Sequence, residues 1–163
     1  MAGSELPSGQ SEIDLRTLPL TEHRVKQYLE KLMALDAQTI GESWGPDQWF
    51  KELPQKWEFS RLLLCGREPI GFVVASLKDK AIHIHRLVVS DAYRGRGCGA
   101  KLLREVAELA QARSLRSLTL KVSKENSTAI AFYGSLGFAE IDASSNNLEL
   151  FVCVPELIAR TVT

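Results

Sequence analysis

The sequence has no excess of charge of either sign. Its 163 residues include 20 basic and 20 acidic ones, which gives a formal net charge of +0 at pH 7. Proteins dedicated to nucleic acid usually carry a basic excess, because much of their affinity comes from neutralising phosphates. Long apolar runs are also missing, and none approaches the ~20 residues of a membrane-spanning helix. We therefore expect neither nucleic acid nor a membrane among the partners.

Cysteine is scarce as well. Cys65, Cys98 and Cys153 are odd in number, far apart and without metal-site spacing such as C-x-x-C, so we expect small buried side chains in a reducing compartment. The first residues, MAGSELPSGQSE, lack the basic stretch and the apolar core of a secretory signal peptide. We expect a cytoplasmic protein with a flexible tail over residues 1–11 and a single domain over residues 12–163.

The apolar residues recur in patterns that predict a mixed α/β (α+β) domain. Strands are expected at 13–18, 58–65, 68–77, 81–89, 114–122, 138–142 and 148–154, and helices at 21–35, 42–53, 97–112 and 125–138. Short breaks favour antiparallel hairpins between 58 and 89, whereas helix 97–112 links two strands that we expect to be parallel. The prediction is a mostly antiparallel sheet of about seven strands with one parallel βαβ crossover.

The stretch YRGRGCGAKLLREV, residues 93–106, places three glycines ahead of an expected helix. Residues 95–100 fit the dinucleotide pattern G-x-G-x-x-A, but the preceding strands are predicted to be antiparallel and no acidic residue ends the next strand. A triphosphate-binding loop would need a hydroxyl residue after Lys101, where Leu102 stands. A plain tight turn remains an alternative, although it needs fewer glycines. Backbone N–H groups at a helix start, flanked by Arg94 and Arg96, favour a pyrophosphate ligand.

Two motifs in this sequence resemble the GNAT superfamily, the acetyl-CoA-dependent N-acetyltransferases. The first is Arg94-x-x-Gly97-x-Gly99 after a valine-rich strand. The second is NSTAIAFYGSLGF, residues 126–138, which matches the family block N-x-x-A-x-x-x-Y-x-x-x-G-F. The resemblance covers almost all of residues 13–154. It implies the GNAT fold, in which the strand before the glycine loop splays away from its parallel neighbour.

The resemblance also implies that the splayed gap receives acetyl-CoA, the acetyl donor. Strand backbone would bond the pantetheine arm, the glycine loop would hold the pyrophosphate, and the helix of the second motif would line the other side. The implied coenzyme-binding residues are Leu87, Val88, Val89, Arg94, Gly95, Arg96, Gly97, Cys98, Gly99, Ala100, Asn126, Ala129, Phe132 and Tyr133.

The implied reaction is direct attack of an amine on the thioester, which needs a base, a stabilised oxyanion and a general acid. Tyr133 matches the general acid of the family, and a backbone N–H near Leu87 would serve the oxyanion. The glutamate that often acts as the base in relatives of the ribosomal-protein type is replaced here by Lys121. His83 is our first candidate for the base, and Glu42, in the expected acceptor loop, is the second.

Strand alternation predicts that His83 and His85 share one face, with Leu87 and Val89 continuing it. The two histidines are equally compatible with half-buried strand residues that take no part in chemistry. Two histidines without a third ligand do not indicate a metal site, and none is predicted.

The acceptor is the least determined partner. The last two expected strands are joined only by DASSNN, so a longer, tyrosine-bearing insertion common in peptide-acetylating relatives is absent. Either a peptide or protein amine or a small-molecule amine remains open. Lys121 also leaves open a non-catalytic acetyl-CoA-binding sensor or interaction module. Analogy with relatives suggests a monomer or a homodimer, with strand 147–154 as an exposed edge for pairing.

Overall fold

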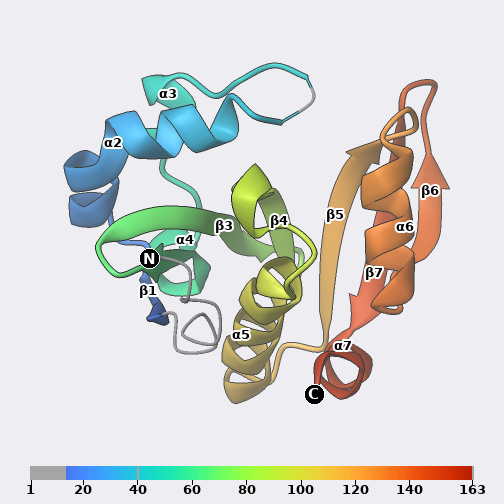
Figure 1. Ribbon diagram of the computed structural model, residues 1–163. Coiled ribbons are helices and arrows are strands. Elements are labelled where there is room, and N and C mark those ends of the chain that lie inside the picture. Colours follow the sequence, from blue (N-terminus) through green and yellow to red (C-terminus); the bar gives the residue numbers. More distant parts are fainter. Residues whose placement is uncertain (1–13, 40, 163) are drawn as a thin grey trace, which may run out of the picture.

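The strands form one seven-stranded sheet in the computed structural model, which describes residues 14–39 and 41–162 (Figure 1). The strands are β1 (Leu15–Pro19), β2 (Arg61–Cys65), β3 (Glu68–Lys78), β4 (Ala81–Val89), β5 (Ser117–Ser123), β6 (Ala139–Ala143) and β7 (Asn147–Cys153). The helices are α2 (Glu22–Asp36), α3 (Pro46–Phe50), α4 (Lys56–Phe59), α5 (Cys98–Ala112), α6 (Ser127–Ser135) and α7 (Val154–Thr161), with a 3-10 turn η1 (Asp91–Tyr93).

The order of strands in the sheet is β1-β2-β3-β4-β5-β7-β6. The β4–β5 pair is parallel and the other five pairs are antiparallel. The predicted fold class, including the crossover through α5, is therefore confirmed. The expected tail, residues 1–11, lies outside the described residues. Among the described helices, none combines the length and the apolar composition needed to cross a membrane.

Two apolar clusters, one on each side of the sheet, make up the core. On the side that we call the α5 face, residues such as Val73, Ile84 and Leu120 pack with α5, α6 and α7. On the opposite side, the α2 face, Phe72 and Val88 pack with α2 and α3. Figure 1 shows α2 and α3 above β3 and β4, with α5 below them. The described residues of the α2-face cluster include none from β5, β6 or β7, so this end of the sheet stays open on the α2 face.

A β-bulge interrupts β4 at His85. Arg86 pairs with Val74 of β3, whereas Ile84 pairs with Ala75, so His85 is the extra residue between two regular pairs. A bulge of this kind lets two consecutive side chains point to the same face and increases the local twist. Strict alternation along β4 therefore ends at this point.

The bulge corrects one part of the predicted face pattern. His83 and His85 do share the α2 face, since Ser76 pairs with His83 in the sheet and also hydrogen-bonds His85. Leu87 and Val89 do not continue that face, because both pack into the cluster on the α5 face. Alternation could not predict this, since a bulge leaves no mark in the apolar pattern.

The segment between α2 and β2 departs most from the prediction. The single helix predicted over 42–53 is wrong, because α3 ends at Phe50, and residues 56–59 form α4 instead of starting a strand. Lys56 accounts for both changes. Its buried ammonium donates hydrogen bonds to the carbonyls of Trp49 (2.8 Å) and Lys51 (2.7 Å) and, at 3.4 Å, of Gln48. This cation closes the carboxyl end of α3 and joins it to α4.

The carboxyl end of the chain adds a helix that the prediction lacks. The first turn of α7 holds Pro155, and Val154 and Leu157, one turn apart, are buried against the α5 face. Proline at a helix start followed by apolar residues at i and i+3 is a recognisable start signal. The segment could therefore have been predicted from the sequence.

The strand suggested for subunit pairing is not an edge. β7 pairs with β5 on one side and with β6 on the other, so both of its edges are hydrogen-bonded within the sheet. The edge strand at this end of the sheet is β6, where Glu140 and Asp142 are exposed. Charged side chains on an edge strand disfavour pairing with a second copy of the same edge.

Candidate active site

β4 and β5 pair over only part of their lengths. Their parallel register runs from Ile82 opposite Leu118 to Ile84 opposite Leu120 and stops there. β4 nevertheless continues to Val89, and β5 continues to Ser123. The two strands diverge after the bulge, as Figure 1 shows. Residues 85–89 of β4 thus carry backbone groups on their β5 side that no strand of the described chain takes up, which is the geometry for an added extended ligand.

The glycine loop lies at the end of β4 and leads into α5. Gly95 and Gly97 have φ angles of 77° and 81°, a left-handed conformation that only glycine adopts readily. Among the described residues, the backbone N–H groups of 95–100 have no hydrogen-bond acceptor, and α5 has no side-chain cap. Six free donors and the positive end of a 15-residue helix make a site for an anion.

The two arginines of the loop are partly engaged already. Arg94 pairs with Asp91 at 2.9 Å and donates to the carbonyl of Val89 at 3.2 Å. The guanidinium of Arg96 lies over the ring of Tyr93, 5.3 Å from its centroid. These contacts hold the loop against the end of β4. Burial raises the pKa of the Cys98 thiol, which keeps it protonated and unreactive.

α6 brings the second motif against the glycine loop. Asn126 caps this helix, with its side-chain oxygen accepting from the N–H of Ala129 at 3.1 Å. A Cβ atom at Gly99 would lie only 3.1 Å from the ring of Phe132, so any larger residue would require this ring to shift where α5 and α6 meet. The motif residues are thus brought together on the α5 face beside the open part of β4.

Tyr133 lies on the same helix, beside Phe132 and Phe138, with ring centroids 5.2 Å and 5.3 Å away. Burial raises the pKa of its phenol to about 12. The hydroxyl therefore stays protonated throughout the neutral range. The described residues offer it no hydrogen-bond partner in the structure. A proton donor on the α5 face is the chemical role open to this group.

The histidines occupy the other side of the sheet. His83 is 7% exposed, and its Nδ1 lies 2.8 Å from the hydroxyl of Thr119 on β5. Its ring meets that of His85 edge to face, with centroids 4.9 Å apart. His85 in turn bonds Ser76 through Nε2 at 2.6 Å. If Nδ1 of His83 donates to Thr119, its Nε2 keeps a lone pair that can accept a proton.

Both imidazoles are neutral at pH 7. Burial, followed by the charge of Lys78, lowers the pKa of His83 below its ordinary value of 6.5. Burial, followed by the nearby His83 and Lys78, lowers the pKa of His85 to about 4. A neutral imidazole is the state that a general base requires.

The lowered pKa of His85 predicts a loss of stability in acid. Between pH 6.5 and pH 4 the unfolded chain binds a proton at this position and the folded chain does not, so stability falls as pH drops through this window. The shift corresponds to about 3.4 kcal/mol, which solvent screening of this partly exposed side chain reduces to about 2–3 kcal/mol. We expect His85→Gln to flatten the dependence of the free energy of unfolding on pH from 6.5 to 4, measured by urea denaturation. The matched control is His23→Gln, which replaces a histidine whose side chain is exposed on α2.

Glu42 and its loop are held over β4 by a buried ion pair. Arg86 donates two bonds to the carboxylate of Asp36, at 2.6 Å and 3.0 Å, and a third, at 2.7 Å, to the carbonyl of Glu42. The same carboxylate accepts from the N–H of Trp44 at 2.6 Å, and the guanidinium lies over the ring of Trp44. Among the described residues, the side chain of Glu42 has no ion-pair partner, so this loop is fixed through its backbone.

Asp36, Arg86 and Thr119 are site residues that sequence reasoning missed. The sequence did contain one indication for Asp36. This residue lies in the last turn of α2, where the helix dipole disfavours a carboxylate. An acid in that position suggests a cationic partner elsewhere in the fold. For Arg86 and Thr119 we find no signal, since their roles depend on the bulge and on the short parallel register.

Comparison with known proteins identifies the family. Residues 26–138, more than half of the chain, match the model of the acetyltransferase (GNAT) family. The chain belongs to this family. In curated relatives, N-alpha-acetyltransferase RimI of Mycobacterium tuberculosis is 38% identical over 118 residues, which cover 69% of this chain and 73% of that protein.

Other matches agree with this placement. An uncharacterized N-acetyltransferase of Methanocaldococcus jannaschii, MJ1207, is 32% identical over 102 residues, 57% of this chain and 45% of that protein. The chain thus spans less than half the length of this relative. The structure of the PaiA N-acetyltransferase of Thermoplasma acidophilum in complex with coenzyme A has a TM-score of 0.73 and 16% identity, covering 86% of this chain and 99% of that one.

Proposed function

We propose that this GNAT protein transfers the acetyl group of acetyl-CoA to a primary amine by direct attack within a ternary complex. The observation that carries the proposal is the coincidence of two open backbone sites, the unpaired end of β4 and the uncapped start of α5. The extended pantetheine arm would hydrogen-bond to the unpaired backbone of β4, and the pyrophosphate would bind at the start of α5. In the described residues, no strand pairs with residues 85–89 of β4 on the β5 side and no acceptor binds the N–H groups of residues 95–100, so the chain fits this coenzyme.

The coenzyme would supply an activated thioester, and the residues of this chain would supply the rest. The backbone of Leu87, Val88 and Val89 would hold the extended arm, with an N–H near Leu87 for the oxyanion. Residues 94–100 would hold the pyrophosphate. Ala129 and Phe132 of α6 would line the other side of the bound coenzyme. Asn126 contributes through the cap that fixes the start of α6.

Tyr133 and His83 lie on opposite sides of the sheet, and this division suits the two proton transfers. Tyr133, on the α5 face, would donate its phenolic proton to the departing sulfur. His83, on the α2 face, would take the proton of the attacking amine, directly or through water. Glu42 remains a second candidate for the base, since its loop also lies on the α2 face. Donor and acceptor would thus approach from different sides.

The assignment of His83 predicts a pH-dependent defect. We expect His83→Ala to lower kcat/KM by about tenfold to a hundredfold near pH 7, where the acceptor amine is mostly protonated. The defect should shrink as pH rises towards the amine pKa of ~10, because the neutral amine then needs no base. Initial rates between pH 6.5 and 10 test this. A defect that is constant across this range would remove His83 from the mechanism and favour Glu42→Gln as the next variant.

The proposed reaction is tested by coenzyme A release with a panel of peptides and small amines. Release that depends on the amine, with an acetylated product identified by mass spectrometry, supports the proposal. Tight binding of acetyl-CoA without acetylation of any amine would contradict it. That result would favour the non-catalytic sensor or interaction module.

A further inference from the structure

The two histidines of the α2 face are each held by a hydroxyl group from a neighbouring strand. Nδ1 of His83 lies 2.8 Å from the hydroxyl of Thr119 on β5. Nε2 of His85 lies 2.6 Å from the hydroxyl of Ser76 on β3. Within the described part of the chain, neither imidazole makes another hydrogen bond. Since the partner of one ring nitrogen determines which nitrogen carries the proton, these two hydroxyls set the tautomers of the histidines.

The hydroxyl of Ser76 depends on His85 for its hydrogen bond. Ser76 is 2% exposed, and among the described residues its hydroxyl has no partner other than Nε2 of His85. A buried hydroxyl proton without an acceptor is costly, so Ser76 donates to Nε2. His85 then carries its own proton on Nδ1 and has no free lone pair. Its pKa of about 4, which burial lowers most, is consistent with an imidazole that takes up no proton near pH 7.

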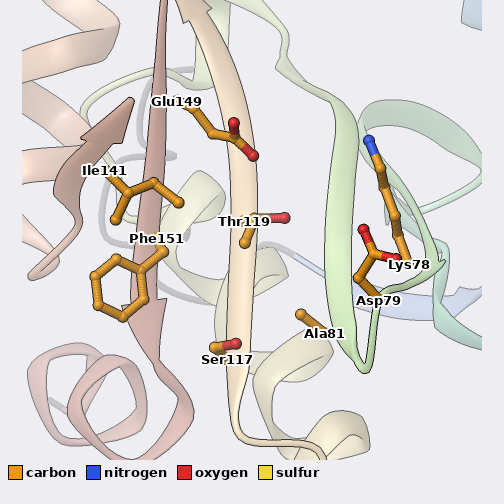
Figure 2. A pocket seen from close by; sticks show the side chains of 8 residues that line it. All are labelled: Lys78, Asp79, Ala81, Ser117, Thr119, Ile141, Glu149 and Phe151. Atoms are coloured by element: carbon orange, nitrogen blue, oxygen red, sulfur yellow. The ribbon is translucent and has the colours of Figure 1, made fainter. Parts of the chain in front are cut away.

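The hydroxyl of Thr119, by contrast, reaches solvent. Thr119 lines a cavity of about 350 Å³ on the uncovered part of the α2 face, beside Ser117 of the same strand (Figure 2). Lys78 and Asp79 of the lining are exposed, so the cavity is open to water. A space of this size holds several water molecules, because each takes ~30 Å³ in the liquid. Thr119 can therefore donate its own proton to water and accept the Nδ1 proton of His83.

Only this direction of the hydrogen bond leaves His83 able to act as a base. When Nδ1–H donates to Thr119, Nε2 keeps its lone pair, and the hydrogen bond persists after Nε2 has been protonated, because an imidazolium donates through both nitrogens. When Thr119 donates to Nδ1 instead, Nε2 carries the proton and the one lone pair of the ring is already engaged. The acceptor role of Thr119 is thus the one that a general base needs.

The charged groups around His83 leave this assignment unchanged. Burial, followed by Lys78 of β3, lowers the pKa of His83. Glu149 of β7 raises this pKa, and Lys121 of β5 lowers it. His85 of β4 meets the ring edge to face and stays neutral. In the described chain, none of these side chains hydrogen-bonds the imidazole of His83. They influence how strongly Nε2 binds a proton, whereas the hydroxyl on β5 determines which nitrogen is free.

We infer that Thr119 and Ser76 are positioning residues that select His83, and not His85, as the base. Thr119 accepts from Nδ1 of His83 and leaves Nε2 open, whereas Ser76 occupies the Nε2 lone pair of His85. The inference rests on the proposed function and deepens it, because it assigns the nitrogen that receives the proton. During transfer the N–H bond of the amine breaks and an N–H bond forms at Nε2, so His83 becomes an imidazolium that later returns this proton to solvent.

The tautomers can be measured without any acceptor, by nitrogen NMR of protein with isotopically labelled histidine. We expect both His83 and His85 to carry their proton on Nδ1 at pH 7. Thr119→Val removes the hydroxyl and should move the proton of His83 to Nε2, the form that a free imidazole side chain prefers in water. Thr119→Ser should keep it on Nδ1. A wild-type His83 protonated on Nε2, or an unchanged tautomer in Thr119→Val, would overturn the inference.

Kinetics test the same assignment through the base. Thr119→Val should lower kcat/KM about fivefold to tenfold near pH 7, since one neutral hydrogen bond holds the tautomer, and Thr119→Ser should restore it. The defect should shrink as pH rises towards the amine pKa of ~10. In a His83→Ala background, Thr119→Val should have no further effect, because both changes act through one base. Ser117→Ala is the control, since it removes a hydroxyl from the same cavity that does not bond His83, and it should keep the wild-type rate.

Two kinetic outcomes would contradict the inference. A defect of Thr119→Val that is constant with pH, or one that adds in full to the defect of His83→Ala, would mean that Thr119 acts on packing and not on the base. Failure to acetylate any amine would instead overturn the proposed function. The NMR measurement would then still decide the tautomers of the two histidines.

Discussion

Tyr133→Phe is expected to lower the kcat of acetyl transfer by about a hundredfold or more, because a general acid contributes roughly 10²–10⁴ in rate. Its pKa of about 12 keeps the proton on the phenol throughout the neutral range. The phenylalanine ring keeps the contacts with Phe132 and Phe138, so packing should be preserved. Affinity for acetyl-CoA should change little, as measured by calorimetry.

A matched control separates chemistry from packing. Phe138→Leu disturbs the same aromatic group without removing the hydroxyl, and it should affect stability more than kcat. If Tyr133→Phe retains wild-type kcat with an acceptor that turns over, the phenol does not protonate the leaving sulfur. Solvent would then be the better candidate for that proton.

Asp36→Ala is expected to cost about 3 kcal/mol of stability and to raise the KM for the acceptor. Asp36 is fully buried and accepts two bonds from Arg86 and one from the N–H of Trp44. Its removal leaves a guanidinium that is only 21% exposed without its carboxylate. Breaking a buried pair from one side typically costs ~3–5 kcal/mol, and the partial exposure of Arg86 favours the lower value.

Urea denaturation measures the loss, and Glu68→Ala provides the comparison. Glu68 pairs with Lys31 at 2.8 Å, but both side chains are more than half exposed, so that pair should contribute under about 1 kcal/mol. The affinity for acetyl-CoA should fall less than the affinity for the acceptor, because none of the Asp36 contacts involves residues 94–100 of the glycine loop. Equal stability losses in the two variants would show that the Asp36 pair does not anchor the loop.

The local structure of the proposed donor side was predictable from the sequence because it depends on short stretches of chain. A glycine loop, a helix start and the Asn126–Phe138 block each lie within one short stretch, and the structure brings them together on the α5 face. The apolar pattern predicted the bounds of β4, Ala81–Val89, correctly. Such features depend on backbone conformation and helix geometry, which short patterns encode.

The arrangement of the α2 face could not be predicted because it depends on contacts between distant segments. The bulge at His85 exchanges the faces of the residues that follow it, so Leu87 and Val89 were placed wrongly. Lys56 ends α3 through three carbonyls, which a propensity argument cannot foresee. The Asp36–Arg86 pair spans 50 positions of the sequence. Tertiary contacts of this kind override local preference.

Amide hydrogen exchange with and without coenzyme A tests the central claim most directly, namely that the coenzyme extends the sheet at the divergence of β4 and β5. We predict increased protection in two segments, residues 86–89 of β4 and residues 95–100 of the glycine loop, with little change in β1 and β2. Binding of coenzyme A that protects neither segment would contradict the account, because the ligand would then occupy a different site.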